Sequence, residues 1–335
     1  MKRSSLRLAG AALAVSALAL AGCGSEDGGG SETETATSGG ADGESYSIGI
    51  TQIVSHPALD AARDGFKAAL ADAGVEVEYD EQNAQNDQAT ATSIANTFAS
   101  ADLDLILAIA TPTAQATAQA ITDTPILITA VTDPLEAGLV DSWEAPGGNL
   151  TGTSDLNPVE EQLQLLQEIA PDARTVGIVY SSGEVNSEIQ VELAQEAAEA
   201  LGITIEVATV TNSGEVQQAA DSLEVDAFYV PTDNTVVSGI ESLLQVAESK
   251  SLPVIAAEGD TVERGAIATY GIDYEELGRQ TGEMALRVLQ DGADPAEMPI
   301  ETQTELALTV NPAAAERMGV ELPAEVLERA DTVIE

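Results

Sequence analysis

Residues 103–113 read LDLILAIATPT, and this stretch decides the fold class. The run from Leu103 to Ala110 is apolar on both faces and lacks the alternation of a strand that faces water on one side. Such a run is typical of a strand buried on both faces of a parallel sheet. Thr111 then precedes Pro112, a proline suited to the first position of a helix. A buried strand that passes at once into a helix indicates a βα unit.

Short runs rich in β-branched residues recur along the chain from Tyr46 onward, separated by segments of helical period. In one of these segments Leu59, Ala62 and Phe66 share a single helical face. Strands that alternate with helices form parallel sheets covered by helices, so we expect an α/β protein. The ten predicted strands are residues 46–51, 75–79, 103–110, 125–131, 175–180, 203–210, 227–231, 253–257, 266–272 and 304–310.

The length of 335 residues suggests about two domains. Ten strands could form one large sheet or two smaller ones. Residues 146–149, PGGN, are the strongest break inside the folded part. Because this break follows the fourth strand, where a chain would cross to a second lobe, we favour two sheets.

The N-terminus has the order of a secretory signal peptide, with three basic residues followed by an apolar stretch at residues 8–21. This stretch is too short for a stable membrane span. It ends in LAGC, residues 20–23, which resembles the bacterial lipobox. We therefore expect a signal peptide over residues 1–22 and lipidation of Cys23. Residues 23–44 are the lipidated cysteine and a flexible acidic tether, because Gly, Ser, Thr, Ala and acids cannot build a core.

Composition excludes several classes of function. The chain has 57 acidic and 12 basic residues and a formal net charge of −45, so a phosphate backbone would repel it and nucleic-acid binding is excluded. Cys23 is the single cysteine, which leaves no disulfide, zinc cluster or thiol chemistry. We expect no metal and no cofactor.

Four stretches together resemble the ABC transporter substrate-binding family that includes the streptococcal and clostridial tryptophan- and tyrosine-binding lipoproteins, and the resemblance covers nearly all of residues 46–320. The stretches are ITQIVSHPALD at 50–60, NLTGTSD at 149–155, VPTDNT at 230–235 and YGIDYEELGRQ at 270–280.

The resemblance implies the type I periplasmic-binding architecture, in which two Rossmann-like lobes with parallel sheets are joined by three crossovers and enclose a ligand in the cleft between them. It places the helix at 274–290 in the first lobe. The expected first lobe is residues 45–150 plus 271–299, and the second is residues 151–270 plus 300–335.

Ligands of parallel α/β sheets sit beyond the carboxyl ends of the strands, and polar side chains follow several strand ends here. Each of them could instead only cap a helix. A zwitterionic amino acid needs donors for its carboxylate, for which the loop 111–113 is suited, and an acceptor for its ammonium group. Asp233 and Asp273 are the leading acceptors, and Glu258 is a weaker one. The candidate ligand-binding residues are Gln52, His56, Thr111, Thr113, Ser181, Ser182, Asn186, Ser187, Asp233, Asn234 and Asp273.

These features predict a monomeric solute-binding lipoprotein of an ABC importer, anchored outside the cell membrane through Cys23, that delivers a small solute to a permease and its ATPase. The solute would be an amino acid, aromatic or otherwise, or a related carboxylated compound. A sugar is less favoured because only Trp143 offers an indole for stacking. A ligand-sensing co-receptor of the same fold stays open. An extracytoplasmic hydrolase would depend on His56, the sole histidine, but the chain lacks a Gly-x-Ser-x-Gly elbow, so we expect no enzyme.

Overall fold

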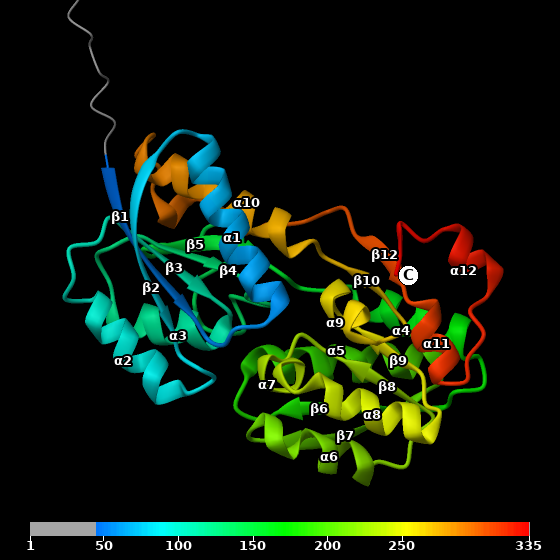
Figure 1. The fold of residues 1–335 in the computed structure, drawn as a ribbon. Coiled ribbons are helices and arrows are strands. Elements are labelled where there is room, and N and C mark those ends of the chain that lie inside the picture. Colours follow the sequence, from blue (N-terminus) through cyan, green and yellow to red (C-terminus); the bar gives the residue numbers. More distant parts are fainter. Residues whose placement is uncertain (1–44, 335) are drawn as a thin grey trace, which may run out of the picture. The chain divides into compact units, whose positions relative to one another are not determined.

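Two mostly parallel β-sheets organise residues 45–334, the part of the chain that the computed structural model describes (Figure 1). The predicted signal peptide, Cys23 and the tether lie outside these residues. The first sheet has six strands in the order β11-β5-β4-β3-β1-β2, all paired in parallel. They are β1 (Ser45–Gln52), β2 (Glu76–Asn83), β3 (Leu105–Ile109), β4 (Ile126–Thr129), β5 (Leu150–Ser154) and β11 (Glu301–Thr302).

The second sheet has seven strands in the order β13-β12-β10-β9-β8-β6-β7. All of its pairs are parallel except β10 with β12, which is antiparallel. The strands are β6 (Thr175–Ser181), β7 (Thr204–Val210), β8 (Ala227–Val230), β9 (Val254–Ala256), β10 (Ala268–Gly271), β12 (Ala307–Val310) and β13 (Thr332–Val333).

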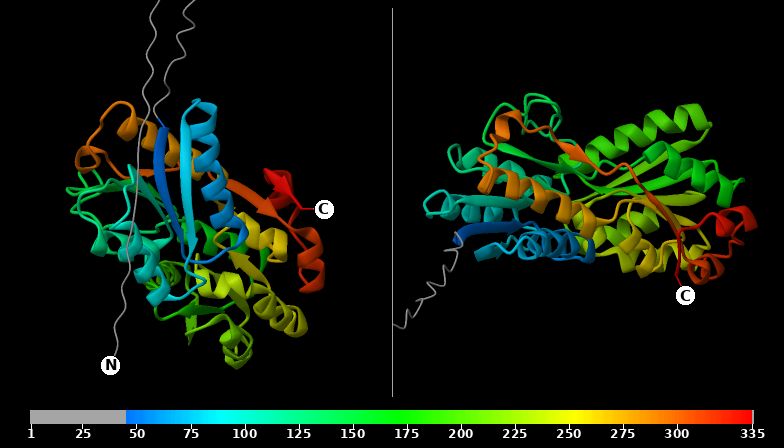
Figure 2. Two further views of the ribbon diagram at one scale, coloured as in Figure 1. Left: turned by 60° about the vertical axis from the view of Figure 1, so that its left-hand side comes forward. Right: turned by 90° about the horizontal axis from the view of Figure 1, so that it is seen from above.

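Helices cover both sheets, and we call each sheet with its helices a lobe. The first lobe has α1 (Pro57–Asp72), α2 (Gln88–Phe98), α3 (Thr111–Ala120) and α10 (Tyr274–Leu289). The second lobe has α4 (Val159–Ile169), α5 (Val185–Leu201), α6 (Val216–Ser222), α7 (Asn234–Ser238), α8 (Ile240–Lys250), α9 (Gly259–Arg264), α11 (Pro312–Arg317) and α12 (Ala324–Glu328). Figure 2 shows α11 and α12, in orange-red and red, beside the strands of the second lobe.

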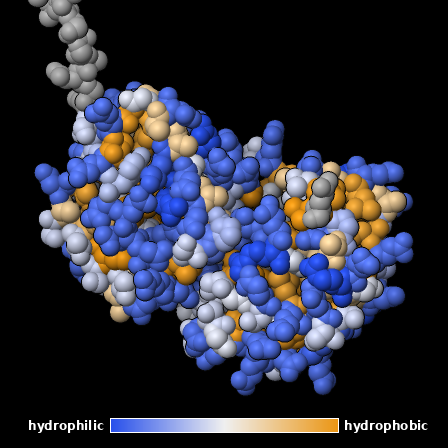
Figure 3. Space-filling view, viewed as in Figure 1, coloured by the Kyte–Doolittle hydropathy of each residue, from blue (hydrophilic) through white to orange (hydrophobic). Residues whose placement is uncertain are grey.

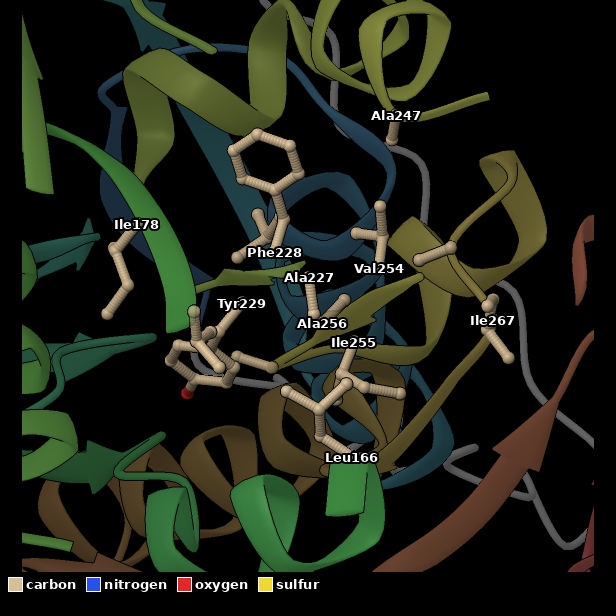
Figure 4. Close-up of a cluster of buried hydrophobic side chains, with 14 of the residues drawn as sticks. Leu166, Ile178, Ala227, Phe228, Tyr229, Ala247, Val254, Ile255, Ala256 and Ile267 are labelled. Carbon is tan, nitrogen blue, oxygen red and sulfur yellow. The ribbon is translucent and has the colours of Figure 1, made fainter. Parts of the chain in front are cut away.

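Each lobe has its own hydrophobic core, which agrees with two sheets rather than one. In the second lobe three neighbouring strands carry Ile178, Phe228 and Ile255, and Phe228 lies on the opposite face of the sheet from Ile255, which lies near Leu166 (Figure 4). A buried polar contact crosses this core, because the hydroxyl of Tyr229 donates to Oε1 of Gln162 at 2.8 Å. Most of the other buried side chains of both cores are Ala, Val, Ile and Leu, as the low aromatic content requires.

The ten predicted strands are confirmed, and three strands were not predicted. These are β5, β11 and β13, and two of them are only two residues long. The strand β5 reads LTGTS and lacks an aliphatic run, although its five residues are buried. It pairs with β4, so the chain stays in the first sheet for one strand beyond the break at residues 146–149.

The chain crosses between the lobes three times, after β5, after β10 and after β11. The strands β5 and β11 pair within the first sheet and so belong to the first lobe. They extend a few residues beyond the boundaries expected at 150 and 299. The exact division of the chain between the lobes stays a prediction.

Helices α1 and α10 pack more closely than side chains would allow, and glycines make this possible. A Cβ atom on Gly278 would overlap the backbone carbonyl of Ala62, and one on Gly65 would overlap the carbonyl of Glu275. On the next turn a Cβ on Gly282 would lie 2.6 Å from Cβ of Ala69. The contact fixes α10 to the first lobe although more than 200 residues separate the two helices in the sequence.

Hydrophilic residues dominate the face of the molecule in Figure 3, as the charge of the chain requires. Within residues 45–334 the structure contains no helix that is both long enough and apolar enough to cross a bilayer.

Replacing Gly278 with Ala tests the glycine contact. The added methyl group must push α1 and α10 apart, and overpacking of this kind costs about 1–3 kcal/mol. We expect the melting temperature to fall by about 2–4 °C for each kcal/mol lost. Gly148→Ala is the matched control, because no atom lies within 4 Å of the Cβ that it adds. Equal melting temperatures for the two variants would contradict the close contact.

Candidate functional site

In each of the two sheets the strand order changes direction once. In the first sheet β1 lies between β2 and β3, and in the second β6 lies between β7 and β8. Loops that leave neighbouring strands in opposite directions open a crevice at the carboxyl ends of the strands, where ligands of such sheets bind. The loops that follow β1, β3, β6 and β8 carry most of the predicted ligand-binding residues.

A narrow cavity with a free volume of about 10 Å³ joins these strand ends and receives side chains from both lobes. The first lobe contributes His56, Leu59, Ala130, Thr132, Asp155 and Tyr274. The second lobe contributes Asn186, Thr232, Asp233, Asn234, Val237 and Glu258. No Lys or Arg is among these lining residues, so the cavity holds three carboxyl groups without a cationic side chain in its wall.

Asp155 follows β5 and is fixed by two hydroxyl groups. Its Oδ2 accepts from the hydroxyl of Tyr274 at 2.8 Å, and its Oδ1 accepts from Oγ1 of Thr132 at 3.1 Å. The side chain is buried, and burial raises the pKa of Asp155 although both hydrogen bonds oppose the rise. The carboxyl group is therefore held in one orientation in a place where its charge is poorly solvated.

Glu258 follows β9 at the start of α9 and is 2 % exposed. Oε1 accepts from Oγ1 of Thr261 at 2.9 Å, and this is the one hydrogen bond that its side chain makes within the described residues. Burial, and then the nearby charge of Asp260, raise the pKa of Glu258 to about 8. A proton therefore resides on this carboxyl group at neutral pH.

Asp233 caps α7 and belongs to a buried network with Glu184. Asp233 accepts from the backbone N–H groups of Ser181 at 2.5 Å and Val236 at 2.7 Å. Burial raises its pKa, and the neighbouring carboxylate of Glu184 raises it further. The oxygens of Asp233 thus already hold a loop and a helix together, which is a structural role.

Glu184 is the centre of this network, although the sequence did not single it out. Its two carboxylate oxygens accept five hydrogen bonds at 2.6–3.2 Å, from side chains and backbone N–H groups of Asn186, Asn234 and Thr235. This buried residue therefore positions Asn186 and Asn234, both of which line the cavity.

Two lining side chains keep a buried atom without a hydrogen-bond partner in the described part of the chain. They are Nδ1 of His56 and Oδ1 of Asn186. Burial lowers the pKa of His56 to about 4, so the imidazole is neutral at pH 7. Buried polar atoms are nearly always hydrogen-bonded, so these two atoms are suited to contact a bound molecule.

Four of the predicted ligand-binding residues line the cavity, namely His56, Asn186, Asp233 and Asn234. Asp273 does not, because it is exposed, caps α10 through the N–H of Glu276 at 3.0 Å and faces a separate surface hollow. Ser182 is also exposed.

The other predicted residues are buried around the cavity and hold its loops. Nε2 of Gln52 donates to Oδ1 of Asp60 at 2.8 Å, and Oγ1 of Thr113 donates to the carbonyl of Ile109 at 2.6 Å. Ser181 presents its backbone N–H to Asp233, and Ser187 lies beside Asn186. Oγ1 of Thr111 is buried at the first turn of α3 and has no hydrogen-bond partner among residues 45–334.

The sequence did not predict Thr132, Asp155, Thr232 or Tyr274 as site residues, and all four line the cavity. Three of them stand in the stretches that carry the family resemblance, which was the available signal. Thr132 comes shortly after a predicted strand and could have been chosen by the strand-end rule. Within residues 45–334 no three His, Cys, Asp or Glu side chains gather in a way that could hold a metal ion.

Neutral hydrogen bonds join the lobes beside the cavity. Nδ2 of Asn86, after β2, donates to Oγ1 of Thr235 at 2.9 Å, and that hydroxyl donates to Glu184. The hydroxyls of Thr132 and Thr232 lie 3.5 Å apart. The strand ends of the two lobes are thus in direct contact.

Replacing Glu184 with Ala should remove the acceptor of five hydrogen bonds. Hydrogen bonds to charged groups contribute about 1.5–3 kcal/mol each and are not additive, so we expect a loss of about 3 kcal/mol or more. The corresponding fall in melting temperature is about 6 °C or more. Glu188→Ala removes an exposed carboxylate from the first turn of the same helix and should leave the melting temperature within about 1 °C. An unchanged melting temperature in the Glu184→Ala variant would show that the network does not stabilise the fold.

Comparisons with known proteins match this architecture. The family model for ABC transporter substrate binding proteins matches residues 47–334. A tyrosine-binding protein of Clostridioides difficile is 45% identical over 271 residues, which are 79% of this chain and 78% of that protein.

Two solved structures show the fold. The complex of a Streptococcus pneumoniae protein with L-Trp has a TM-score of 0.84 at 36% identity and covers 87% of this chain and 100% of that chain. The ligand-free, open substrate-binding protein of Clostridium difficile has a TM-score of 0.66 at 46% identity and covers 86% and 99%. The predicted fold, type I periplasmic-binding architecture, is confirmed, and the chain belongs to the family of ABC transporter substrate-binding proteins.

Proposed function

We propose that this chain captures an amino acid with an aromatic side chain and delivers it to an ABC importer. The observation that supports this most is the cavity, in which three carboxyl groups from two lobes face a space without a lining Lys or Arg. A buried carboxylate is costly unless a cation or several donors accompany it. The ammonium group of an amino acid supplies both a charge and donors.

Asp155 is the primary acceptor for the ammonium group. It lines the cavity, and the hydroxyls of Tyr274 and Thr132 hold it in place while each of its oxygens retains capacity to accept. The sequence favoured Asp233 and Asp273 instead. Asp273 is exposed, and Asp233 already accepts two backbone N–H groups, so Asp155 is better suited.

The N-terminus of α3 is suited to the carboxylate of the ligand. Its first residue, Thr111, has a buried hydroxyl without a hydrogen-bond partner in the part of the chain that the structure describes. The free N–H groups and dipole of a helix N-terminus favour an anion. The helix starts at the end of β3, beside β4, and Ala130 just after β4 lines the cavity. Thr111 therefore stays a ligand-binding candidate although it is not itself in the lining.

The apolar part of the wall suits the side chain of the ligand. Leu59, Ala130 and Val237 supply it, and Tyr274 adds an aromatic ring. The tyrosine-binding and tryptophan-bound relatives support an aromatic amino acid.

Membership of the family suggests the partners and the location that delivery requires. Substrate-binding proteins of ABC importers are extracytoplasmic, and we propose a permease and an ATPase as partners and lipidated Cys23 as the membrane anchor. We also propose binding without turnover. Within residues 45–334 no group hydrogen-bonds Nδ1 of His56, the atom that an orienting acid contacts in a hydrolytic triad.

A thermal-shift screen of the L-amino acids tests the function. We expect L-tyrosine or L-tryptophan to raise the melting temperature by about 5–10 °C at about 100 times the dissociation constant, since binding then adds about 2.7 kcal/mol. Asp155→Asn should weaken binding at least about tenfold through loss of a charge-assisted hydrogen bond. Asp123→Asn, at an exposed position of the same lobe, should bind as the unchanged protein does. No shift with any amino acid, or consumption of the ligand, would refute the proposal.

A further inference from the structure

Among the three carboxyl groups of the cavity, Glu258 is the least satisfied. Asp155 accepts two hydroxyl hydrogen bonds and Asp233 accepts two backbone N–H groups. Glu258 accepts one, at Oε1, and within the described residues Oε2 has no donor. Removal from water without compensating donors disfavours the ionised form more than the protonated form.

The charges around Glu258 do not remedy this. On its own helix Asp260 opposes ionisation and Arg264 favours it. From the other elements around the cavity, Asp155 after β5 opposes ionisation, Tyr274 of α10 is uncharged at neutral pH, and His56 before α1 is neutral. Asp233 after β8 adds a further acidic group to the same wall. The arrangement retains a proton on Glu258 while the cavity is empty.

We propose that ligand binding is coupled to the release of a proton from Glu258, and that Glu258 thereby selects ligands that carry an ammonium group. The inference rests on the proposed capture of an amino acid. On binding, the O–H bond of the Glu258 carboxyl group breaks and the proton passes to a base in solvent. The carboxylate then accepts a hydrogen bond from the ligand ammonium group, whose N–H bonds all stay intact.

The direction of the pH dependence follows from this exchange. A bound ammonium group favours the ionised form of Glu258 and lowers its pKa below the value of about 8 that it has in the empty cavity. Between the two values the complex binds fewer protons than the free protein, so affinity rises with pH. The rise approaches about tenfold per pH unit and levels off above about pH 8.

Isothermal titration calorimetry with L-tyrosine measures the coupling. The titration is run at pH 7 in phosphate and in Tris, whose heats of ionisation differ, and again in one buffer at pH 6, 7 and 8. We expect release of nearly one proton per ligand at pH 7. The dissociation constant should fall about tenfold from pH 6 to pH 7 and about fivefold from pH 7 to pH 8.

Glu258→Gln should bind with little proton release and with an affinity that hardly changes with pH. Glu263→Gln is the matched control, because it removes an exposed carboxylate from the same helix and should keep both the release and the slope. Infrared difference spectra of the unchanged protein give a second measurement that needs no variant. Adding L-tyrosine should remove the C=O stretch of a protonated carboxyl group.

The outcomes separate this inference from the proposed function. Failure of every L-amino acid to bind would overturn the function itself. Binding with heats that do not depend on the buffer, or with no loss of the protonated C=O stretch, would overturn the proton exchange and leave the function standing. If the Glu258→Gln variant still released nearly one proton per bound ligand, the proton would belong to another carboxyl group. That result would overturn the role of Glu258.

Discussion

The contact between α1 and α10 is the constraint on which the site depends. Glycines at positions 65 and 278 let the two backbones touch, and each helix starts at the cavity. His56 immediately precedes α1, and Tyr274 is the first residue of α10, where its hydroxyl reaches Asp155. One tightly packed pair of helices thus fixes the imidazole, the phenol and the carboxyl group of the first lobe relative to one another.

The second lobe reaches the same precision by a polar route. Glu184 gathers five donors from the loops after β6 and β8, so the cavity wall there is held by hydrogen bonds to a buried carboxylate rather than by helix packing. This arrangement uses residues that an acidic chain has in abundance. It also has a cost, because the charge of Glu184 works against ionisation of Asp233. A wall of this kind favours ligands that bring positive charge.

Much of the fold could be predicted from the sequence, and less of the site. Long apolar runs such as residues 103–110 identified their strands, whereas β5, with Thr and Ser in place of aliphatic residues, gave no such signal. Strand ends identified the loops around the cavity but not the direction of each side chain. Gln52 is the last residue of β1, and Asp155 directly follows β5. The side chain of Gln52 nevertheless donates to Asp60, whereas that of Asp155 lines the cavity. Such directions depend on contacts between distant segments, as between Asp155 and Tyr274, which local spacing does not encode. Which residues touch the ligand stays a prediction.

The hydrogen bond between Asn86 and Thr235 has a consequence for how the protein responds to salt. Amide and hydroxyl are both uncharged, so dissolved ions hardly weaken the bond between the lobe tips. The same ions do screen the mutual repulsion of two strongly acidic lobes. A rise in ionic strength therefore weakens the repulsion between the lobes and leaves the hydrogen bond that joins them almost unchanged.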